Sequence, residues 1–223
     1  MHPNGGAVRI ERTMSSYPLS KQILDKGVSL VLLVVLAPVF AIVLAAMGID
    51  MLVSTRDRGR WLYRERRVTR GREFDLLKFR TLRRDVLERV RSEELHARLH
   101  EGDERNLTWA GRRILKPWYL DELPQIWNVI RGNMSLVGPR PWPPSMVSNQ
   151  VAKGLVYRNE FVAGWTGPAQ VAKGLVESAG YAQLDLEYVD ACRNSGARQI
   201  VRRDLEILRR TVLVMARGEG LRF

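Results

Sequence analysis

The chain of 223 residues contains one cysteine, Cys192, and three histidines. A single cysteine excludes an intramolecular disulfide and fits a protein of a reducing compartment. Cys192 has no His or Asn in a telling motif around it, so we expect it to be structural. His96 and His100 are spaced to share one helix face, but no third ligand stands nearby, which argues against a metal site there.

The 23 residues from Gly27 to Ile49 include no charged side chain. As a helix this stretch would measure about 35 Å, enough to cross a hydrocarbon core of roughly 30 Å. Pro38 stands at its middle, where its ring removes a helical hydrogen bond and kinks the helix. A secretory signal peptide is disfavoured because the apolar run is too long and no small-residue cleavage site follows it.

Basic residues flank this segment on both sides, and basic flanks mark the cytoplasmic face of a membrane. A hairpin that enters and returns through one leaflet keeps both flanks on that face, so we favour it over a kinked single span. We therefore expect a disordered tail (residues 1–16), a Pro-kinked re-entrant membrane helix with its flanks (17–55) and a globular domain on the cytoplasmic face (56–223).

Lysine and arginine outnumber aspartate and glutamate by 36 to 24, which gives a net charge of +12. This balance suits nucleic acid, acidic lipid or a phosphorylated substrate as partner. The membrane segment favours lipid and phosphate. We expect no nucleic-acid partner, because the chain has no recognised binding motif and no interleaved aromatic stacking platform.

Hydrophobic patterning predicts an α+β fold that is mainly helical, with a short β-hairpin. Residues 62–82 read as a strand pair around a turn at Thr69–Arg72. Alternation then places Lys78 and Arg80 on one strand face, where two neighbouring cations invite an anion between them.

Three helices are also predicted. Residues 84–98 carry a thin apolar stripe, and residues 200–215 form a basic amphipathic helix that packs on the core or lies among lipid headgroups. A further helix is expected to begin at Asp121, which is a good N-cap, with Pro124 tolerated in its first turn.

Residues 120–141 carry the densest chemistry of the chain. Asp121 and Glu122 are adjacent carboxylates at the expected helix N-terminus, where the dipole and free N–H groups favour the ionised form. An ionised aspartate can attack a phosphoryl group, and a neighbouring glutamate can hold Mg²⁺. Arg140, between two prolines, suits phosphate binding. Taken alone, the Asp-Glu pair is more often just a helix cap.

The chain resembles the bacterial sugar transferase family, the monotopic phosphoglycosyl transferases. The specific motifs are Leu-Asp-Glu-Leu-Pro-Gln at residues 120–125 and Ser-Leu-Val-Gly-Pro-Arg-Pro at 135–141. Lys-Phe-Arg-Thr at 78–81, Gly-Trp-Thr-Gly at 164–167 and the Pro-kinked segment also resemble family features.

The resemblance implies an enzyme that transfers a sugar 1-phosphate from a nucleotide diphosphate sugar to a polyprenyl phosphate at the bacterial inner membrane. It implies that Asp121 forms a covalent phosphosugar intermediate, and that Glu122, together with Asp121, holds Mg²⁺. Substrate contacts would come from Lys78, Arg80, Gly138, Arg140 and Gln170. Membrane lipid and a second copy of the chain, in a homodimer, are further expected partners.

The sequence departs from the family pattern where an arginine usually precedes the Thr-Gly turn, because Val162 stands there. Arg158 and Lys173 are candidates to replace it. A non-catalytic protein that binds polyprenyl phosphate or scaffolds a glycan assembly complex remains the alternative function, although the intact Asp121 and Glu122 argue against it.

The hairpin hypothesis predicts that both flanks of the membrane segment face the cytoplasm. Single cysteines introduced beside Arg12 and beside Arg58 should both resist an impermeant thiol reagent added to intact cells. Labelling at one of the two positions from outside would establish a spanning helix. Pro38→Ala should favour that straight spanning form, because it restores the missing helical hydrogen bond.

Overall fold

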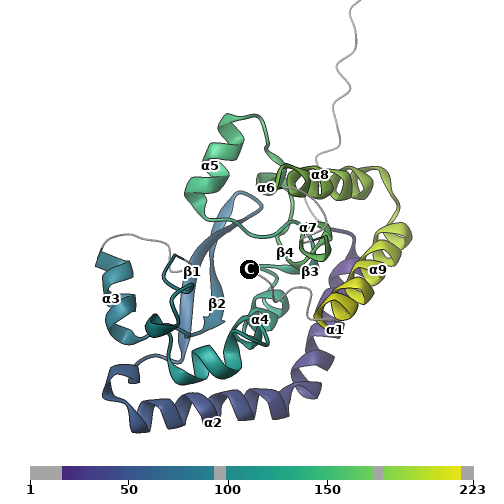
Figure 1. The fold of residues 1–223 in the computed structure, drawn as a ribbon. Helices are drawn as coiled ribbons and strands as arrows, with labels where there is room; N and C mark the ends of the chain where they lie inside the picture. The colour runs from purple at the N-terminus through teal and green to yellow at the C-terminus, as the bar shows by residue number, and fades with distance from the viewer. Residues whose placement is uncertain (1–16, 93–98, 173–177, 217–223) are drawn as a thin grey trace, which may run out of the picture.

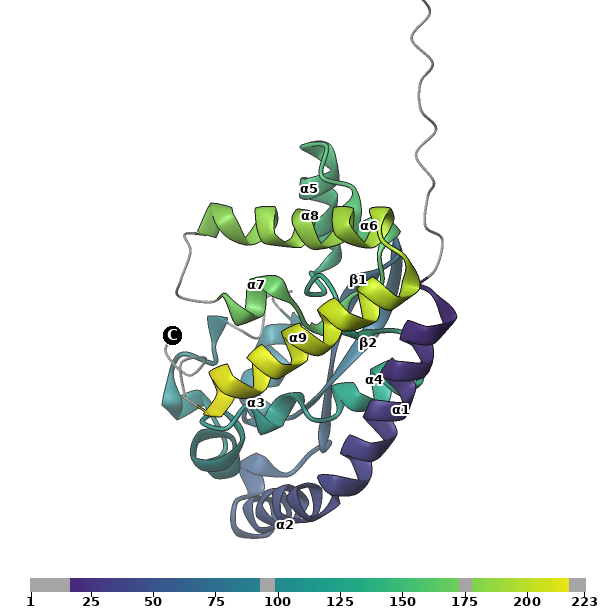
Figure 2. The ribbon, with the colours of Figure 1, turned by 90° about the vertical axis from the view of Figure 1, so that its right-hand side faces the viewer.

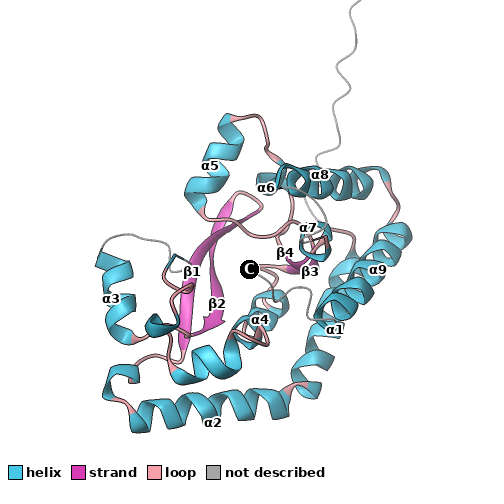
Figure 3. Ribbon diagram, viewed as in Figure 1, coloured by secondary structure: helices cyan, strands magenta, loops and turns pink. Residues whose placement is uncertain are grey.

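A computed structural model describes residues 17–92, 99–172 and 178–216. The described chain is mostly helical and contains two small two-stranded sheets (Figures 1 and 3). This confirms the expected mixture of helices with a small sheet. The tail 1–16 and His96 lie outside the described residues.

Helices α1 (Leu19–Val35) and α2 (Ala37–Val53) are separated by Leu36 and bent by 59°. Pro38 lies in the first turn of α2, where its missing N–H costs no helical bond. The predicted kink is therefore confirmed. Among the described residues, no single helix is long and apolar enough to cross a membrane, although the bent pair passes that test jointly. The re-entrant path remains a prediction.

The bent pair forms two sides of the molecule, with the remaining elements in its angle (Figures 1 and 2). α2 buries Val43, Ala46 and Met47 against a cluster that includes Phe79 and Leu115. Other apolar side chains of the pair are exposed: Leu19, Ile23, Leu30, Val31, Val34, Val35, Ile42, Leu44, Ile49, Leu52 and Val53.

Strands β1 (Leu62–Thr69) and β2 (Arg72–Phe79) form the predicted antiparallel hairpin. Arg70 and Gly71 turn the chain with φ of 48° and 67°, which matches the left-handed backbone of a tight two-residue turn. Asn128 covers the edge of β2, since its amide nitrogen donates to Asp75 O (2.8 Å) and its amide oxygen accepts from Leu77 N (2.9 Å).

The second sheet pairs β3 (Ser135–Val137) with β4 (Gly164–Thr166) in parallel. A Cβ added at Gly164 would lie 2.1 Å from Gly138 N, so the two backbone segments approach each other at a distance that only glycine permits. The helices around the sheets are α3 (Arg84–Ser92), α4 (Gln125–Ile130), α5 (Pro144–Ala152), α6 (Tyr157–Glu160), α7 (Pro168–Val171), α8 (Ser178–Asn194) and α9 (Ala197–Ala216).

The helix expected to begin at Asp121 begins instead at Gln125, so that prediction is wrong. Residues Leu120–Glu122 form a separate 3₁₀ turn, η5, and Leu123 N donates to Leu120 O at 3.2 Å. Pro124 has no backbone N–H and so cannot donate a helical hydrogen bond back to η5. The α-helix therefore starts after Pro124.

The predicted basic helix is α9. Of the apolar positions expected to share its packed face (Val201, Leu205, Leu208, Val212 and Met215), Leu208 packs against the core. Ile200, Asp204 and Ile207 are buried, whereas Leu205 and Val212 are 49% and 65% exposed. The exposed surface of α9 is therefore mixed, because Leu213 and Met215 are exposed on the same helix as Glu206 and Arg210.

Lys21 joins α1 to the interior of the domain. Its side chain is 0% exposed, and Nζ donates to Asp204 Oδ2 (2.5 Å) of α9 and to Val137 O (3.0 Å) of β3. Tyr188 of α8 donates to Asp204 Oδ1 at 2.8 Å. Beside it, Asp25 accepts hydrogen bonds from Ser135 Oγ and Leu136 N. Cys192, as expected, is buried in the core.

Asp204→Asn should lower the free energy of unfolding by about 3 kcal/mol or more, because it leaves the buried ammonium of Lys21 poorly compensated. Glu206→Gln is the matched control on the same helix, since its pair with Arg210 is exposed and should contribute less than about 1 kcal/mol. Denaturant unfolding in detergent micelles measures both variants. Equal stability of the two variants would show that the buried pair does not hold α1 to the domain.

Candidate active site

The two adjacent carboxylates, Asp121 and Glu122, lie in η5 beside β2. Tyr119, directly before η5, has φ of 52°, a left-handed conformation that costs a non-glycine residue about 1–2 kcal/mol. Asn128 fixes α4 against β2 and so sets the position of η5 relative to Lys78 on that strand.

Asp121 is 2% exposed, and Lys116 Nζ donates to its Oδ2 at 3.1 Å. Its other oxygen, Oδ1, is buried and has no hydrogen-bond partner among the described residues. Burial raises the pKa of Asp121, and Lys116 acts against this rise. No capping hydrogen bond comes from the Asp121 side chain. The ionised form is therefore favoured by Lys116 and not, as the sequence suggested, by an N-cap position.

Lys116 is itself held between two carboxylates. Its Nζ lies 2.7 Å from Glu101 Oε2 and 3.1 Å from Asp121 Oδ2. Burial lowers the pKa of Lys116, but the two carboxylates outweigh burial and raise it above its usual value. Lys116 therefore stays cationic next to Asp121.

Glu122 faces a different set of cations. Arg140 Nη2 donates to Glu122 Oε1 at 2.9 Å, and Lys78 Nζ lies 4.0 Å from the same oxygen. Burial would raise the pKa of Glu122, but Arg140 and Lys78 lower it to about 2. Glu122 is therefore ionised at neutral pH, and the structure brings together three predicted site residues: Glu122, Lys78 and Arg140.

The backbone around Arg140 is fixed from several sides. Gly138 N donates to Thr166 O (2.9 Å), and Gly164 N donates to Pro139 O (2.8 Å). Arg158 Nη1 donates to Arg140 O at 2.8 Å. Gly138, a predicted site residue, thus lies in the stretch that carries Arg140 to Glu122.

The guanidinium of Arg158 is occupied by contacts within the protein. Its guanidinium also donates to Gln150 and Asp185 and stacks 4.3 Å from the Trp142 ring centroid. It supports the Arg140 backbone, which differs from its suggested role as a replacement for the family arginine at Val162. Val162 is buried in the core, and Lys173 lies outside the described residues.

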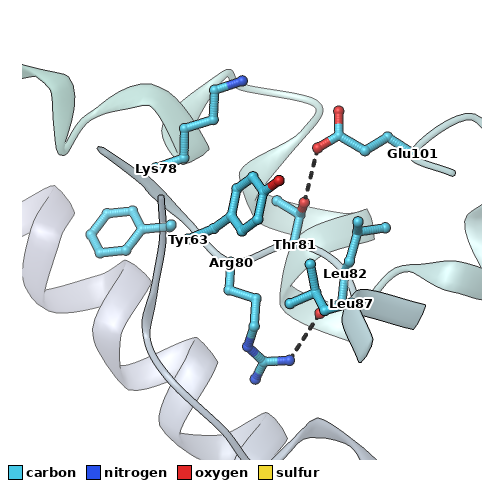
Figure 4. A pocket seen from close by; sticks show the side chains of 8 residues that line it. Tyr63, Lys78, Arg80, Thr81, Leu82, Leu87 and Glu101 are labelled. Carbon is cyan, nitrogen blue, oxygen red and sulfur yellow. Dashed lines mark hydrogen bonds between the residues drawn. The ribbon is translucent and has the colours of Figure 1, made fainter. Parts of the chain in front are cut away.

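Arg80 does not share a free strand face with Lys78, and that expectation is wrong. Figure 4 shows their side chains extending in opposite directions beside a pocket that Tyr63, Thr81 and Glu101 also line. Arg80 is 4% exposed, and its guanidinium donates to the carbonyls of residues 57, 60 and 82. These bonds tie Arg80 to the backbone because β2 ends at Phe79 and the following chain turns inward.

Gln170 lies in α7. Both of its amide atoms are buried without a hydrogen-bond partner in the described chain. A Cβ added at Gly167 would lie 2.2 Å from Gly138 O and 3.0 Å from Gln170 Oε1. Gln170 is thus close to Gly138 behind the Arg140 loop.

Sequence reasoning missed Lys116, Glu101, Glu65 and Arg67. The last two were within reach, because alternation along the predicted hairpin places Glu65, Arg67 and Lys78 on one face. Lys116 and Glu101 carried no such signal, since no regular sequence pattern relates them to Asp121; the fold brings Lys116 between the two carboxylates.

The donor set is compatible with Mg²⁺ bound together with a phosphorylated ligand. Mg²⁺ takes one or two protein carboxylates plus phosphate oxygens and water, and Asp121 Oδ1 is a buried oxygen to which none of the described residues donates. In the described parts of the chain, no group of three or more His, Cys, Asp or Glu side chains forms a cage of its own.

Comparisons with known proteins agree on one family. The sequence model described as "Bacterial sugar transferase" matches residues 16–218. The chain is 33% identical over 217 residues to the UDP-glucose:undecaprenyl-phosphate glucose-1-phosphate transferase of Caulobacter vibrioides, covering 95% of this chain and 73% of that protein.

Two further relatives are longer. The undecaprenyl-phosphate glucose phosphotransferase of Komagataeibacter xylinus is 34% identical over 78% of this chain, which spans 32% of that protein. The UDP-N-acetylgalactosamine-undecaprenyl-phosphate N-acetylgalactosaminephosphotransferase of Aeromonas hydrophila is 27% identical over 74% of this chain, which spans 38% of that protein. The chain thus covers about a third of these two relatives.

Proposed function

The chain belongs to the bacterial sugar transferase family, and from this membership we propose that it transfers a sugar 1-phosphate from a nucleotide diphosphate sugar to a polyprenyl phosphate. The observation that carries the proposal is the buried Oδ1 of Asp121, which has no hydrogen-bond partner in the described chain and belongs to a carboxylate paired with Lys116. The names of the relatives point to UDP as the nucleotide and undecaprenyl phosphate as the acceptor.

In the proposed first step, Asp121 Oδ1 attacks the phosphorus bonded to the sugar. The bond from this phosphorus to the oxygen that bridges the two phosphates breaks, and nucleoside monophosphate leaves with that oxygen. A phosphosugar remains on the aspartate as an acyl phosphate. Arg140 and Lys78 stand at Glu122, where they can bind the phosphate oxygens of the donor.

In the second step, an oxygen of polyprenyl phosphate attacks the same phosphorus. The acyl phosphate bond breaks, Asp121 regains its carboxylate, and polyprenyl diphosphate sugar is released. Two separate steps suit a water-soluble donor and a lipid acceptor, because the two need not meet in one complex.

Glu122 and Asp121 are the residues that would hold Mg²⁺. When bound, the ion supplies positive charge against the negative charge of the diphosphate and carboxylates. Lys116, Lys78 and Arg140 add three protein cations at fixed positions around the same carboxylates.

The exposed apolar surface supports attachment to membrane lipid. It covers the outer faces of α1 and α2, and the outward face of α9 adds exposed Leu205, Val212 and Met215. Aliphatic faces of this kind insert into the interfacial region of a bilayer. We place the catalytic domain on the cytoplasmic face of the inner membrane, where nucleotide sugars are available, and leave the homodimer as a prediction.

Asp121→Asn should reduce turnover at least about a thousandfold, because it removes the nucleophile with little change of shape. With a donor radiolabelled at the sugar-bonded phosphate and no lipid present, label should remain on the wild-type protein and not on Asp121→Asn. Asp190→Asn changes an exposed carboxylate of α8 and is the control. Robust turnover by Asp121→Asn would show direct transfer.

The alternative scaffold function is tested by the wild type itself. Failure of the wild type to release nucleoside monophosphate from any UDP-sugar would favour the scaffold function.

Lys116→Gln should move the acid limb of the pH–rate profile to higher pH. Lys116 lowers the pKa of Asp121, so without it the carboxylate stays protonated, and hence non-nucleophilic, up to a higher pH. Measurement of kcat/KM against pH tests this shift, with Lys116→Arg expected to retain the wild-type limb and Lys153→Gln as an exposed control. An unshifted limb in Lys116→Gln would separate Lys116 from the ionisation of Asp121.

A further inference from the structure

Five charged side chains form one continuous series of ion pairs from β1 to the loop after β3. This charged row consists of Arg67, Glu65, Lys78, Glu122 and Arg140. Arg67 Nη2 lies 2.5 Å from Glu65 Oε1, and Lys78 Nζ lies 3.6 Å from Glu65 Oε2. Lys78 and Arg140 then meet at Glu122. Three cations and two anions leave the row with one uncompensated positive charge, and both ends of the row are guanidinium groups.

Arg67 uses only part of its hydrogen-bonding capacity within the described chain. Its side chain is 14% exposed, and Nε is buried without a partner in the described chain. Burial lowers the pKa of Arg67, Glu65 raises it, and the nearby Arg140 lowers it again. A guanidinium keeps its charge in proteins, so a second cation close to it is accommodated best by an anion between the two.

The opposite face of the same hairpin shows what an ordinary surface pair looks like. Arg66, next to Arg67 in sequence, pairs with Glu73 at 3.5 Å and Asp75 at 3.4 Å, and its side chain is 63% exposed. Such pairs are satisfied by water and by carboxylates already present. Arg67 instead faces the site and is largely buried, and Glu65, the carboxylate it contacts, is also paired with Lys78.

We propose that Arg67 is a donor-binding residue that contacts the diphosphate together with Lys78 and Arg140, and that Glu65 competes with the diphosphate for Arg67. The inference rests on the proposed function, which supplies the diphosphate. A diphosphate offers several charged oxygens where Glu65 offers two, and guanidinium groups bind such oxygens in pairs. Donor binding therefore exchanges the contact between Arg67 and Glu65 for a contact between Arg67 and phosphate.

Because Glu65 and the diphosphate compete for Arg67, substitutions of Arg67 and Glu65 should change donor binding in opposite directions. Arg67→Gln should raise the Kd for UDP and the KM for the UDP-sugar donor about tenfold, the usual effect of losing a charge-assisted hydrogen bond, while the KM for polyprenyl phosphate stays unchanged. Glu65→Gln should lower the Kd for UDP and the donor KM several-fold. Arg67→Lys, which retains the charge but loses the paired donors, should fall between Arg67→Gln and the wild type.

The controls make the same charge changes on the other strand face. Arg66→Gln and Glu73→Gln should leave the Kd for UDP and both KM values within about twofold of the wild type. Calorimetric titration of detergent-solubilised full-length protein with UDP measures Kd, and release of nucleoside monophosphate measures turnover. Thermal unfolding of each variant identifies any loss of fold.

Two results would overturn the inference while the proposed function stands. In the first, the wild type turns over UDP-sugar and the Kd for UDP is the same in Arg67→Gln as in Arg66→Gln. In the second, Glu65→Gln weakens UDP binding as much as Arg67→Gln does, which means that the pair only stabilises the hairpin. Absence of turnover in the wild type contradicts the proposed function instead, and this outcome is distinguishable because UDP binding is measured separately.

Discussion

The rest of the structure depends on the buried ion pair between Lys21 and Asp204. A cation with no exposure to water must be surrounded by acceptors, and Lys21 finds them in α9 and β3 while it sits in the first turns of α1. The helix pair that carries the exposed apolar surface is thereby fixed to the core. Because the same contact holds Val137, it also fixes the strand that leads to Arg140. Removal of Asp204 leaves Lys21 with only the more distant carboxylate of Asp25, at 3.8 Å, so the ammonium is poorly compensated.

In the candidate active site, too, each charged side chain faces one of opposite sign. Asp121 is paired with Lys116, Lys116 with Glu101, and Glu122 with Arg140 and Lys78. The two adjacent carboxylates are nevertheless unlike. Burial raises the pKa of Asp121, whereas surrounding cations lower that of Glu122 to about 2. This difference suits two roles, because one oxygen of Asp121 has no partner among the residues that the structure describes, while Glu122 is held as an anion.

Backbone geometry explains why the motifs are glycine- and proline-rich. Gly138, directly after β3, lies against Gly164 of β4, and a side chain at either would collide with the opposite backbone. Pro124 ends the hydrogen bonding of η5, so the two carboxylates lie on a short turn and not on the helix that follows. Pro38 divides the apolar segment into two helices with different directions. Each of these residues fixes a change of chain direction that a packed side chain alone would not specify.

The sequence by itself determined the family, the apolar segment with its kink, the hairpin and the residue types of the site, because these are local: motif spacing, charge absence and strand alternation are all read within about twenty residues. Only the tertiary structure decided which cations face which carboxylates. Lys116 and Glu101 lie near Asp121 through the course of the intervening chain, and Arg80, alike in type to Lys78, turns inward to bind backbone carbonyls. The packing of α9 was likewise decided by tertiary contacts, since Asp204 is buried against Lys21 while its neighbour Leu205 is exposed. Pairing of charges depends on distances between segments remote in sequence, and those distances exist only once the chain has folded.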